Sequence, residues 1–211
     1  MELLSALEVI TPLTTYVLFL SPIPTLYKTI KSNAVDLLAP LPLSMGFLCS
    51  FVYLYYGLLS SNSTLAICNA IGCALSVAYL IAYYLFAKLK TKFLKHLIVL
   101  LIITATIVII VRWSEYQTEV LGAICTVVNL VTMGAPLAEL NDVIRLQSTE
   151  NLPFPLILVT FINGLEWSLY GWIIHDAVVW APNAIGAMLG AVQLALFVIF
   201  PSTGSSRSKT E

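Results

Sequence analysis

The sequence has too few charged residues to form a water-soluble protein. Charged side chains make up 10% of the 211 residues and the mean hydropathy is +0.94, whereas a typical soluble domain carries roughly 25% charged residues. Such a chain cannot cover its whole surface with groups that water solvates, so we expect an integral membrane protein with the lipid bilayer as its surroundings. The formal net charge of −1 offers no basic patch, which argues against nucleic acid as a partner.

Residues suited to catalysis or metal binding are also scarce. The chain has two histidines, His96 and His175, and its four cysteines all lie within apolar runs. No spacing resembles a metal site, a disulfide framework, a nucleophile elbow or a Gly-rich phosphate loop. We therefore expect no enzyme activity, no metal ion and no cofactor. The N-terminus lacks the basic segment of a cleaved signal peptide, so the first apolar run is expected to remain as a permanent helix.

Long apolar runs are abundant, and seven of them reach the roughly 20 residues that a membrane-spanning helix needs. Short connectors rich in Ser, Asn and Thr separate several of the runs. The fold class is therefore predicted as an all-α membrane protein with seven transmembrane helices. The predicted helices are 3–29, 42–60, 65–87, 93–112, 119–146, 153–174 and 177–200.

An internal repeat organises these helices. The tetrapeptide at 69–72, Asn-Ala-Ile-Gly, recurs at 183–186, and the same offset of 114 residues relates Pro22 to Pro136. Several matches in one register predict two copies, roughly 19–87 and 133–200. The helix at 93–112 has no counterpart. Because one unmatched helix lies between the copies, they should share one orientation, as parallel repeats of three helices (3+1+3).

The repeat also predicts the domain organisation. A linker helix should join two three-helix repeats, and a short polar tail that we expect to be disordered should follow. The predicted segments are 1–87 for the first repeat, 88–114 for the linker helix, 115–200 for the second repeat and 201–211 for the tail.

Lysine and arginine lie almost entirely on one side of the predicted membrane. One side holds only Arg112, and the opposite side holds nine basic residues. The positive-inside rule makes the nine-residue side cytosolic, which places the N-terminus outside or in a lumen and the C-terminus in the cytosol. The glycosylation sequon at Asn62 falls on the outer side, in agreement. The membrane is predicted to be the plasma membrane or an endomembrane. The cytosolic residues are Lys28, Lys31, Lys88, Lys90, Lys92, Lys95, Arg145, Arg207 and Lys209.

Four prolines are candidates for hinges. Pro22 and Pro136 lie at matching positions inside the first and fifth predicted helices, where proline removes a backbone hydrogen bond and kinks the helix. Pro42 and Pro153 open the second and sixth predicted helices at the cytosolic side. The alternative interpretation is ordinary packing, because membrane helices tolerate proline.

Two matched asparagines, Asn69 and Asn183, lie within the third and seventh predicted helices. A polar side chain in the membrane costs free energy unless it faces a partner or a cavity. The simpler reading is a hydrogen bond between helices. Two equivalent carboxamides instead favour a shared site for a neutral polyol, since an amide offers donors and an acceptor but cannot balance an ionic substrate's charge.

Two further pairs follow the same offset: Tyr53 with Trp167, and Cys49 with Asn163. Aromatic faces pack well against flat, amphipathic ligands such as a sugar ring. Residues four positions apart share a helix face, so Tyr53 should lie beside Cys49 and Trp167 beside Asn163. We expect all three pairs to line one central cavity. Because Cys49 pairs with Asn163, the two halves would line this cavity unequally.

Glu166 and Glu139 are ionisable residues at membrane depth. Such residues are by default candidates for function, including proton relay. Each occurs in only one copy, beside polar neighbours, and Glu139 lies near the cytosolic side. Glu166 is therefore retained as a candidate for coupling to protons.

The motifs resemble the SWEET family of sugar transporters over nearly the whole chain apart from the tail. The resemblance implies two three-helix bundles joined by an inversion helix, and bidirectional facilitated sugar transport by alternating access. It assigns gating to Pro22, Pro42, Pro136, Pro153, Tyr56 and Tyr170, and sugar contacts to Asn69, Asn183, Tyr53, Trp167, Cys49 and Asn163. The family's size-selecting positions fall on Cys49 and Asn163, which are bulkier than two serines and so favour a monosaccharide over a disaccharide. The motifs are Phe19-Leu20-Ser21-Pro22, Tyr55-Tyr56-Gly57, Asn69-Ala70-Ile71-Gly72, Gly134-Ala135-Pro136-Leu137, Leu152-Pro153-Phe154, Trp167-x-x-Tyr170-Gly171 and Pro182-Asn183-Ala184-Ile185-Gly186.

Two alternatives to a sugar uniporter stay open from the sequence. The first is a proton-coupled transporter of the related PQ-loop type, although Pro22-Ile23 and Pro136-Leu137 stand where that type has Pro-Gln. The second is a membrane receptor or interaction protein that transports nothing. A homo-oligomer is compatible with the sequence under any of these hypotheses.

Overall fold

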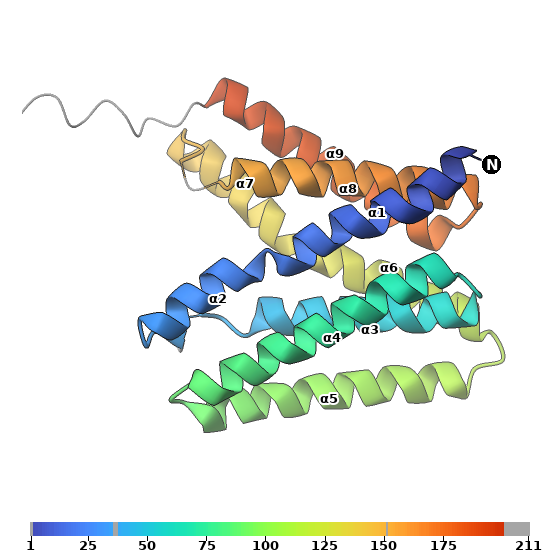
Figure 1. The fold of residues 1–211 in the computed structure, drawn as a ribbon, viewed down its shortest axis with the longest axis horizontal. Helices are drawn as coiled ribbons and strands as arrows, with labels where there is room; N and C mark the ends of the chain where they lie inside the picture. The colour runs from blue at the N-terminus through green and yellow to red at the C-terminus, as the bar shows by residue number, and fades with distance from the viewer. Residues whose placement is uncertain (1, 36–37, 151, 201–211) are drawn as a thin grey trace, which may run out of the picture. The chain divides into compact units, whose positions relative to one another are not determined.

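The computed structural model describes residues 2–35, 38–150 and 152–200 and is all-helical in these ranges (Figure 1). The predicted fold class is confirmed. The helices are α1 (Glu2–Leu20), α2 (Pro22–Lys31), α3 (Leu41–Leu59), α4 (Ser63–Phe86), α5 (Lys90–Arg112), α6 (Gln117–Thr132), α7 (Gly134–Leu146), α8 (Phe154–Ile173) and α9 (Ala177–Ile199).

Seven helical spans in the described residues are long and apolar enough to cross a membrane. Two of them are composite: α1 with α2 forms the span Glu2–Lys31, and α6 with α7 forms Gln117–Leu146. Large apolar side chains project outward from the spans, as at Ile102 of α5, which is 59% exposed. Exposed apolar surface on this scale marks contact with lipid or a partner.

The two composite spans are interrupted close to the matched prolines. Ser21 separates α1 from α2, and Pro22 is the first residue of α2 (Figure 1). Met133 separates α6 from α7, and Pro136 is the third residue of α7. The sequence predicted one kinked helix at each place. Because proline lacks an N–H and is accommodated best in the first turn of a helix, the chain instead begins a new helix there.

The backbone repeats with the offset that the sequence motifs predicted. In the described residues, four residues other than glycine have a positive φ: Asn33 at 53°, Ser61 at 55°, Gln147 at 54° and His175 at 58°. They form two pairs, 33 with 147 and 61 with 175, and both pairs differ by 114 positions. Left-handed conformations are uncommon outside glycine. Their recurrence in one register shows that the turns of the two copies are built alike.

The starts of α4 and α9 also correspond. Asn62 caps α4 by accepting a hydrogen bond from the Leu65 N–H through its side chain, at 3.0 Å. Asp176 caps α9 by accepting from the Val178 N–H, also at 3.0 Å. Both residue types are favoured at this position because their oxygen satisfies a helix N–H that lacks a partner.

A glycine at the end of the preceding helix lets each helix pair approach closely. A Cβ on Gly57 of α3 would lie 2.8 Å from the backbone nitrogen of Ala66 in α4. A Cβ on Gly171 of α8 would lie 2.6 Å from the backbone nitrogen of Trp180 in α9. Both distances are too short for real atoms. The glycines therefore fix how α3 packs on α4 and how α8 packs on α9.

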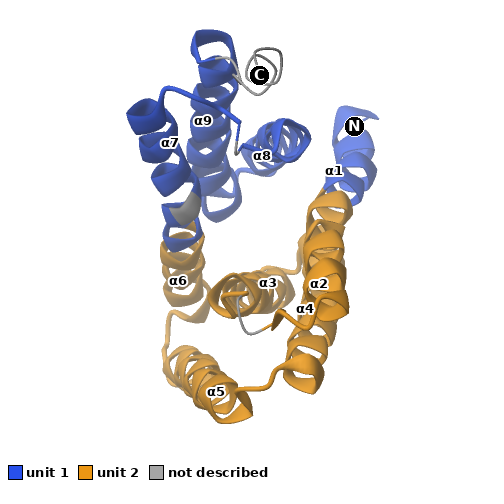
Figure 2. Cartoon of the chain, turned by 90° about the vertical axis from the view of Figure 1, so that its left-hand side faces the viewer, with its two compact units in different colours: residues 1–14, 130–211 blue, residues 15–129 orange. Residues whose placement is uncertain are grey.

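The chain divides into two compact units (Figure 2). Unit 1 consists of residues 1–14 and 130–211, and unit 2 of residues 15–129, so the divisions fall within α1 and α6. The segment boundaries expected from the repeat, at 87 and 115, remain predictions.

The start of α5 differs from the prediction. Helix α5 begins at Lys90, earlier than the predicted 93, so Lys90 and Lys92 belong to its first turn and not to the connector. The predicted polar tail at 201–211, which carries Arg207 and Lys209, lies outside the described residues.

Candidate functional site

The matched asparagines adopt the same hydrogen-bonding arrangement. The Asn69 side-chain amide donates to the Leu65 carbonyl at 2.9 Å, and the Asn183 amide donates to the Val179 carbonyl at 2.7 Å. Each bond reaches back one turn of its own helix. Within the described residues, the structure records no further hydrogen bond from either side chain. Each carboxamide therefore keeps its oxygen acceptor and one N–H for another partner.

In unit 2, Tyr53 and Cys49 lie one turn apart on α3. Tyr53 is buried, and its hydroxyl accepts a hydrogen bond from the Asn129 side-chain amide of α6 at 3.2 Å. Cys49 is half-buried and carries a free thiol. The sequence reasoning missed Asn129. Its polar side chain within the apolar run 119–146 was the signal that could have found it.

In unit 1, the predicted pocket tryptophan contacts a predicted gating residue. The Trp167 and Tyr170 rings meet edge to face, with centroids 5.5 Å apart and planes at 87°. Both side chains are buried on α8. This geometry is favourable for an aromatic pair. A change in the position of the Tyr170 ring would therefore alter its packing against the Trp167 indole.

A polar network in unit 1 joins Asn163 and Glu166 of α8 to α1. The Asn163 amide donates to the Thr14 hydroxyl oxygen at 2.8 Å and approaches the Thr11 carbonyl at 3.3 Å. The Thr14 hydroxyl in turn donates to the Glu166 carboxylate. The threonines were missed in the sequence, although a polar cluster at 11–15 inside an apolar run is a visible signal.

The other membrane-depth carboxylate has a separate partner in unit 1. Glu139 of α7 accepts a hydrogen bond at 3.2 Å from the side-chain amide of Gln193 on α9. Gln193 is 4% exposed, so its amide needs a partner within the protein. Glu139 therefore satisfies a buried polar group and ties α7 to α9.

The four candidate hinge prolines occupy helix beginnings. Pro22 opens α2, Pro42 is the second residue of α3, Pro136 lies in the first turn of α7, and Pro153 is the N-cap of α8. Pro22 and Pro136 are equivalent in the repeat. Pro42 and Pro153 differ by 111 positions rather than 114, so they begin their helices in slightly different ways.

A family described as a sugar efflux transporter for intercellular exchange matches the chain twice, over residues 5–91 and 119–204. The two matches begin 114 residues apart, as the repeated motifs do, and leave most of α5 unmatched. The chain belongs to this family, the SWEET sugar transporters. The predicted resemblance and the 3+1+3 reading of the fold agree with this result.

Individual relatives carry the same name. Sugar transporter SWEET1 of Drosophila pseudoobscura pseudoobscura is 34% identical over 95% of this chain and 89% of its own length. Sugar transporter SWEET1 of Caenorhabditis elegans is 34% identical over 94% of this chain and 66% of its own length. Bidirectional sugar transporter SWEET13 of Oryza sativa subsp. japonica is 30% identical over 89% of this chain and 66% of its own length.

A solved structure of a eukaryotic SWEET transporter also has this fold. It aligns with a TM-score of 0.86 at 27% identity, covering 94% of this chain and 96% of the other. The relatives are transporters, so this SWEET protein is an integral membrane transporter for sugars and not an enzyme.

Proposed function

We propose that this SWEET protein is a bidirectional uniporter that moves sugar by alternating access and favours a monosaccharide such as glucose over sucrose. The observation that carries the proposal is the shared arrangement of Asn69 and Asn183. Each holds one amide N–H on its own helix and keeps an acceptor and a donor for a ligand. Two neutral groups of mixed character suit hydroxyls, which also donate and accept.

The remaining matched residues have complementary roles in this proposal. Tyr53 and Trp167 pack on the apolar C–H face of the sugar ring, as aromatic faces favour flat amphipathic ligands. Cys49 and Asn163 limit the size of the sugar. Each matched pair contributes one residue to unit 1 and one to unit 2.

Glu166 is best understood as a positioning residue. Its carboxylate accepts from Thr14, and Thr14 accepts from Asn163. This chain holds the Asn163 amide in one orientation beside α1. No proton transfer is needed to explain a carboxylate with such partners, which supports uniport over coupling to protons.

Uptake measurements test the function directly. Radiolabelled glucose and sucrose are offered to a transport-deficient cell that expresses the protein, with and without a protonophore. We expect glucose uptake to exceed sucrose uptake and to persist without a proton gradient. Equal uptake of the two sugars would remove the monosaccharide preference. Loss of uptake with the protonophore would favour the coupled transporter, and no uptake of either sugar would favour a receptor.

Substitution of Glu166 separates positioning from proton relay. Glu166→Gln keeps an oxygen that accepts from Thr14, so we expect uptake within about twofold of wild type and an unchanged pH profile. Glu166→Ala removes the acceptor, and leaving a hydrogen-bonding group without its partner costs roughly 1–3 kcal/mol, or about 5- to 150-fold. If Gln lowers uptake as much as Ala and flattens the pH profile, the carboxylate carries protons instead.

The matched prolines are predicted to act as hinges, because alternating access requires elements that bend between two states. Pro22→Ala or Pro136→Ala restores a backbone N–H and should favour a continuous helix across the break after α1 or α6. We expect slower exchange of labelled sugar with normal amounts of protein at the membrane. Pro12, which lies inside α1 away from the break, supplies the control Pro12→Ala. Wild-type exchange in both hinge variants would mean that these prolines serve packing alone.

The orientation follows from the distribution of basic residues and has its own test. A tag after Glu211 should be accessible from the cytosol. Asn62 is expected to be a poor glycosylation acceptor in the native loop, because its side chain caps α4. Lengthening the 60–64 loop should release the cap and give glycosylation at Asn62. A C-terminal tag protected inside a lumen would contradict the orientation.

A further inference from the structure

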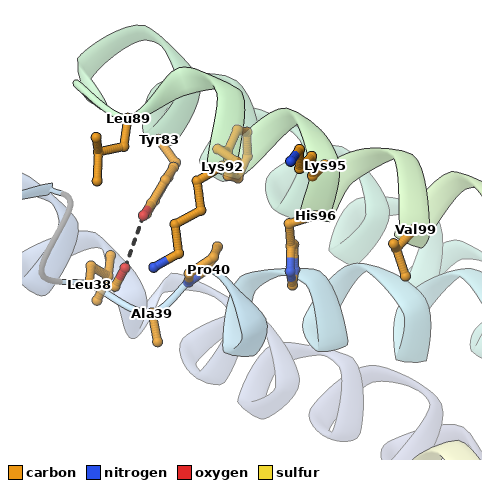
Figure 3. Close-up of a pocket in the computed structure, with 10 residues that line it drawn as sticks. Leu38, Ala39, Pro40, Tyr83, Leu89, Lys92, Lys95, His96 and Val99 are labelled. Carbon is orange, nitrogen blue, oxygen red and sulfur yellow. Dashed lines mark hydrogen bonds between the residues drawn. The ribbon is translucent and has the colours of Figure 1, made fainter.

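Unit 2 contains a cavity of about 570 Å³ at the end of its helices where α3 and α5 begin. It lies between the segment that leads into α3, the last turns of α4 and the first turns of α5 (Figure 3). None of the residues assigned to sugar transport lines it. The lining residues are Leu38, Ala39, Pro40, Tyr83, Leu89, Lys92, Phe93, Lys95, His96 and Val99.

The cavity has a fixed wall. The Tyr83 hydroxyl donates to the Leu38 carbonyl at 3.0 Å (Figure 3). The Tyr83 ring stacks on the Phe93 ring, with centroids 4.6 Å apart. Tyr83 and Phe93 are both buried, at 5% and 3% exposure. These contacts hold the segment before α3 against α4 and α5. The space is therefore shaped by packed side chains and is not a gap between mobile loops.

Its basic groups come from α5. Lys95 and His96 lie three and four positions after Lys92, so both are its neighbours on the helix surface. His96 lies 2.8 Å from the Ser44 hydroxyl, measured from Nε2. Neither lysine forms an ion pair or a hydrogen bond with the described residues. Figure 3 shows the Lys92 ammonium extended towards the segment at 38–40. Two cations thus face this cavity without a recorded counter-charge.

The rest of the lining is apolar, and part of it continues onto the outer surface. Leu89, which precedes the two lysines in the sequence, is 60% exposed, and Val99, which follows them, is 55% exposed. Because α5 begins at Lys90, the lysines lie where a span meets the aqueous boundary, and Val99 lies deeper. A ligand that fits must be anionic at one end and apolar at the other.

We propose that this cavity binds the headgroup of an anionic phospholipid, with its phosphate between Lys92 and Lys95 and its acyl chains along the apolar face near Val99. A free phosphate compound carries the same negative charge but has no acyl chains to contact the apolar wall. Anionic lipids are concentrated in the cytosolic leaflet, and basic pockets between transmembrane helices bind such headgroups. The choice of leaflet rests on the orientation proposed above, whereas the binding itself does not depend on sugar transport.

Native mass spectrometry of the purified full-length protein in detergent tests the proposal. Phosphatidylserine and phosphatidylcholine with identical acyl chains are titrated separately, and glycerophosphoserine is added as a soluble competitor. We expect phosphatidylserine to be retained preferentially. The double substitution Lys92→Gln, Lys95→Gln should weaken its binding by about 30-fold, since each basic residue near an anionic headgroup contributes roughly a fivefold factor.

The matched control is Lys28→Gln, Lys31→Gln in α2, which removes the same charge from exposed positions outside the cavity. It should change binding by less than twofold. Equal loss in the two double variants would mean that only net charge matters and would overturn the site. Equal binding of the two lipids would also overturn it. Full competition by glycerophosphoserine would assign the cavity to a soluble phosphate compound instead. Both double variants are expected to fold, which retained sugar uptake would verify.

Discussion

Replacing Asn69 and Asn183 together by alanine is expected to reduce sugar uptake below detection while the protein still reaches the membrane. Each substitution removes the acceptor and donor that the asparagine keeps for a ligand. A ligand hydroxyl left without its partner costs roughly 1–3 kcal/mol, so each single variant should lose about 5- to 150-fold in transport. The two losses should combine, because each asparagine forms its hydrogen bond within its own helix and shares no hydrogen-bond partner with the other.

Surface-exposed Asn141 of α7 offers the control. Asn141→Ala removes an identical side chain from an exposed position outside the matched pairs, and uptake should stay at the wild-type rate. Uptake is normalised to protein at the cell surface, measured by labelling an external tag. Wild-type uptake in the double variant would refute the proposed sugar site.

Gly171→Ala is expected to produce the largest loss of stability among conservative substitutions. The new Cβ would lie 2.6 Å from the Trp180 backbone nitrogen and 3.0 Å from its Cα, so α8 and α9 must separate. Backbone atoms cannot rotate away as a side chain can, and overpacking typically costs about 1–3 kcal/mol or more. We expect a lower melting temperature in detergent, and a similar loss for Gly57→Ala, whose Cβ meets Ala66.

Gly46 provides a matched control within α3. A Cβ there would meet only the Ser76 hydroxyl at 3.7 Å, which is an ordinary contact. Gly46→Ala should be neutral or raise stability by up to about 1 kcal/mol, because alanine suits a helix interior better than glycine. If Gly171→Ala has the same melting temperature as Gly46→Ala, close packing at Gly171 does not hold α8 and α9 together.

The repeated architecture could be predicted because local patterns in the sequence indicate it. Apolar runs gave seven spans, and the recurrence of the tetrapeptide at 69–72 gave the pairing of the copies. The same offset then reappears in features that the motifs do not contain, such as the left-handed residues Ser61 and His175. Turn geometry depends on the neighbouring backbone, so the two copies of a repeated sequence form turns of the same geometry.

Side-chain partners could not be predicted in the same way. The bond from Asn129 to Tyr53 joins positions 76 residues apart, and that from Thr14 to Glu166 joins positions 152 apart. A sequence indicates that a polar residue in an apolar run needs a partner, but not which one. The breaks at Ser21 and Met133 were similarly anticipated only as kinks, because a proline identifies a weak point without deciding how far the helix opens.

The unmatched helix has a consequence for how the chain enters the membrane during synthesis. Lys88, Lys90, Lys92 and Lys95 cluster at the start of α5, whereas α6 to α9 carry a single basic residue, Arg145. The strongest retention signal in the protein thus emerges from the ribosome before the second copy does. Once those lysines are held on one side, the remaining helices have little charge with which to choose differently. We therefore expect the second repeat to take its orientation from α5, and mutations that neutralise this lysine cluster should give chains in which the first repeat is inserted correctly and the second is not.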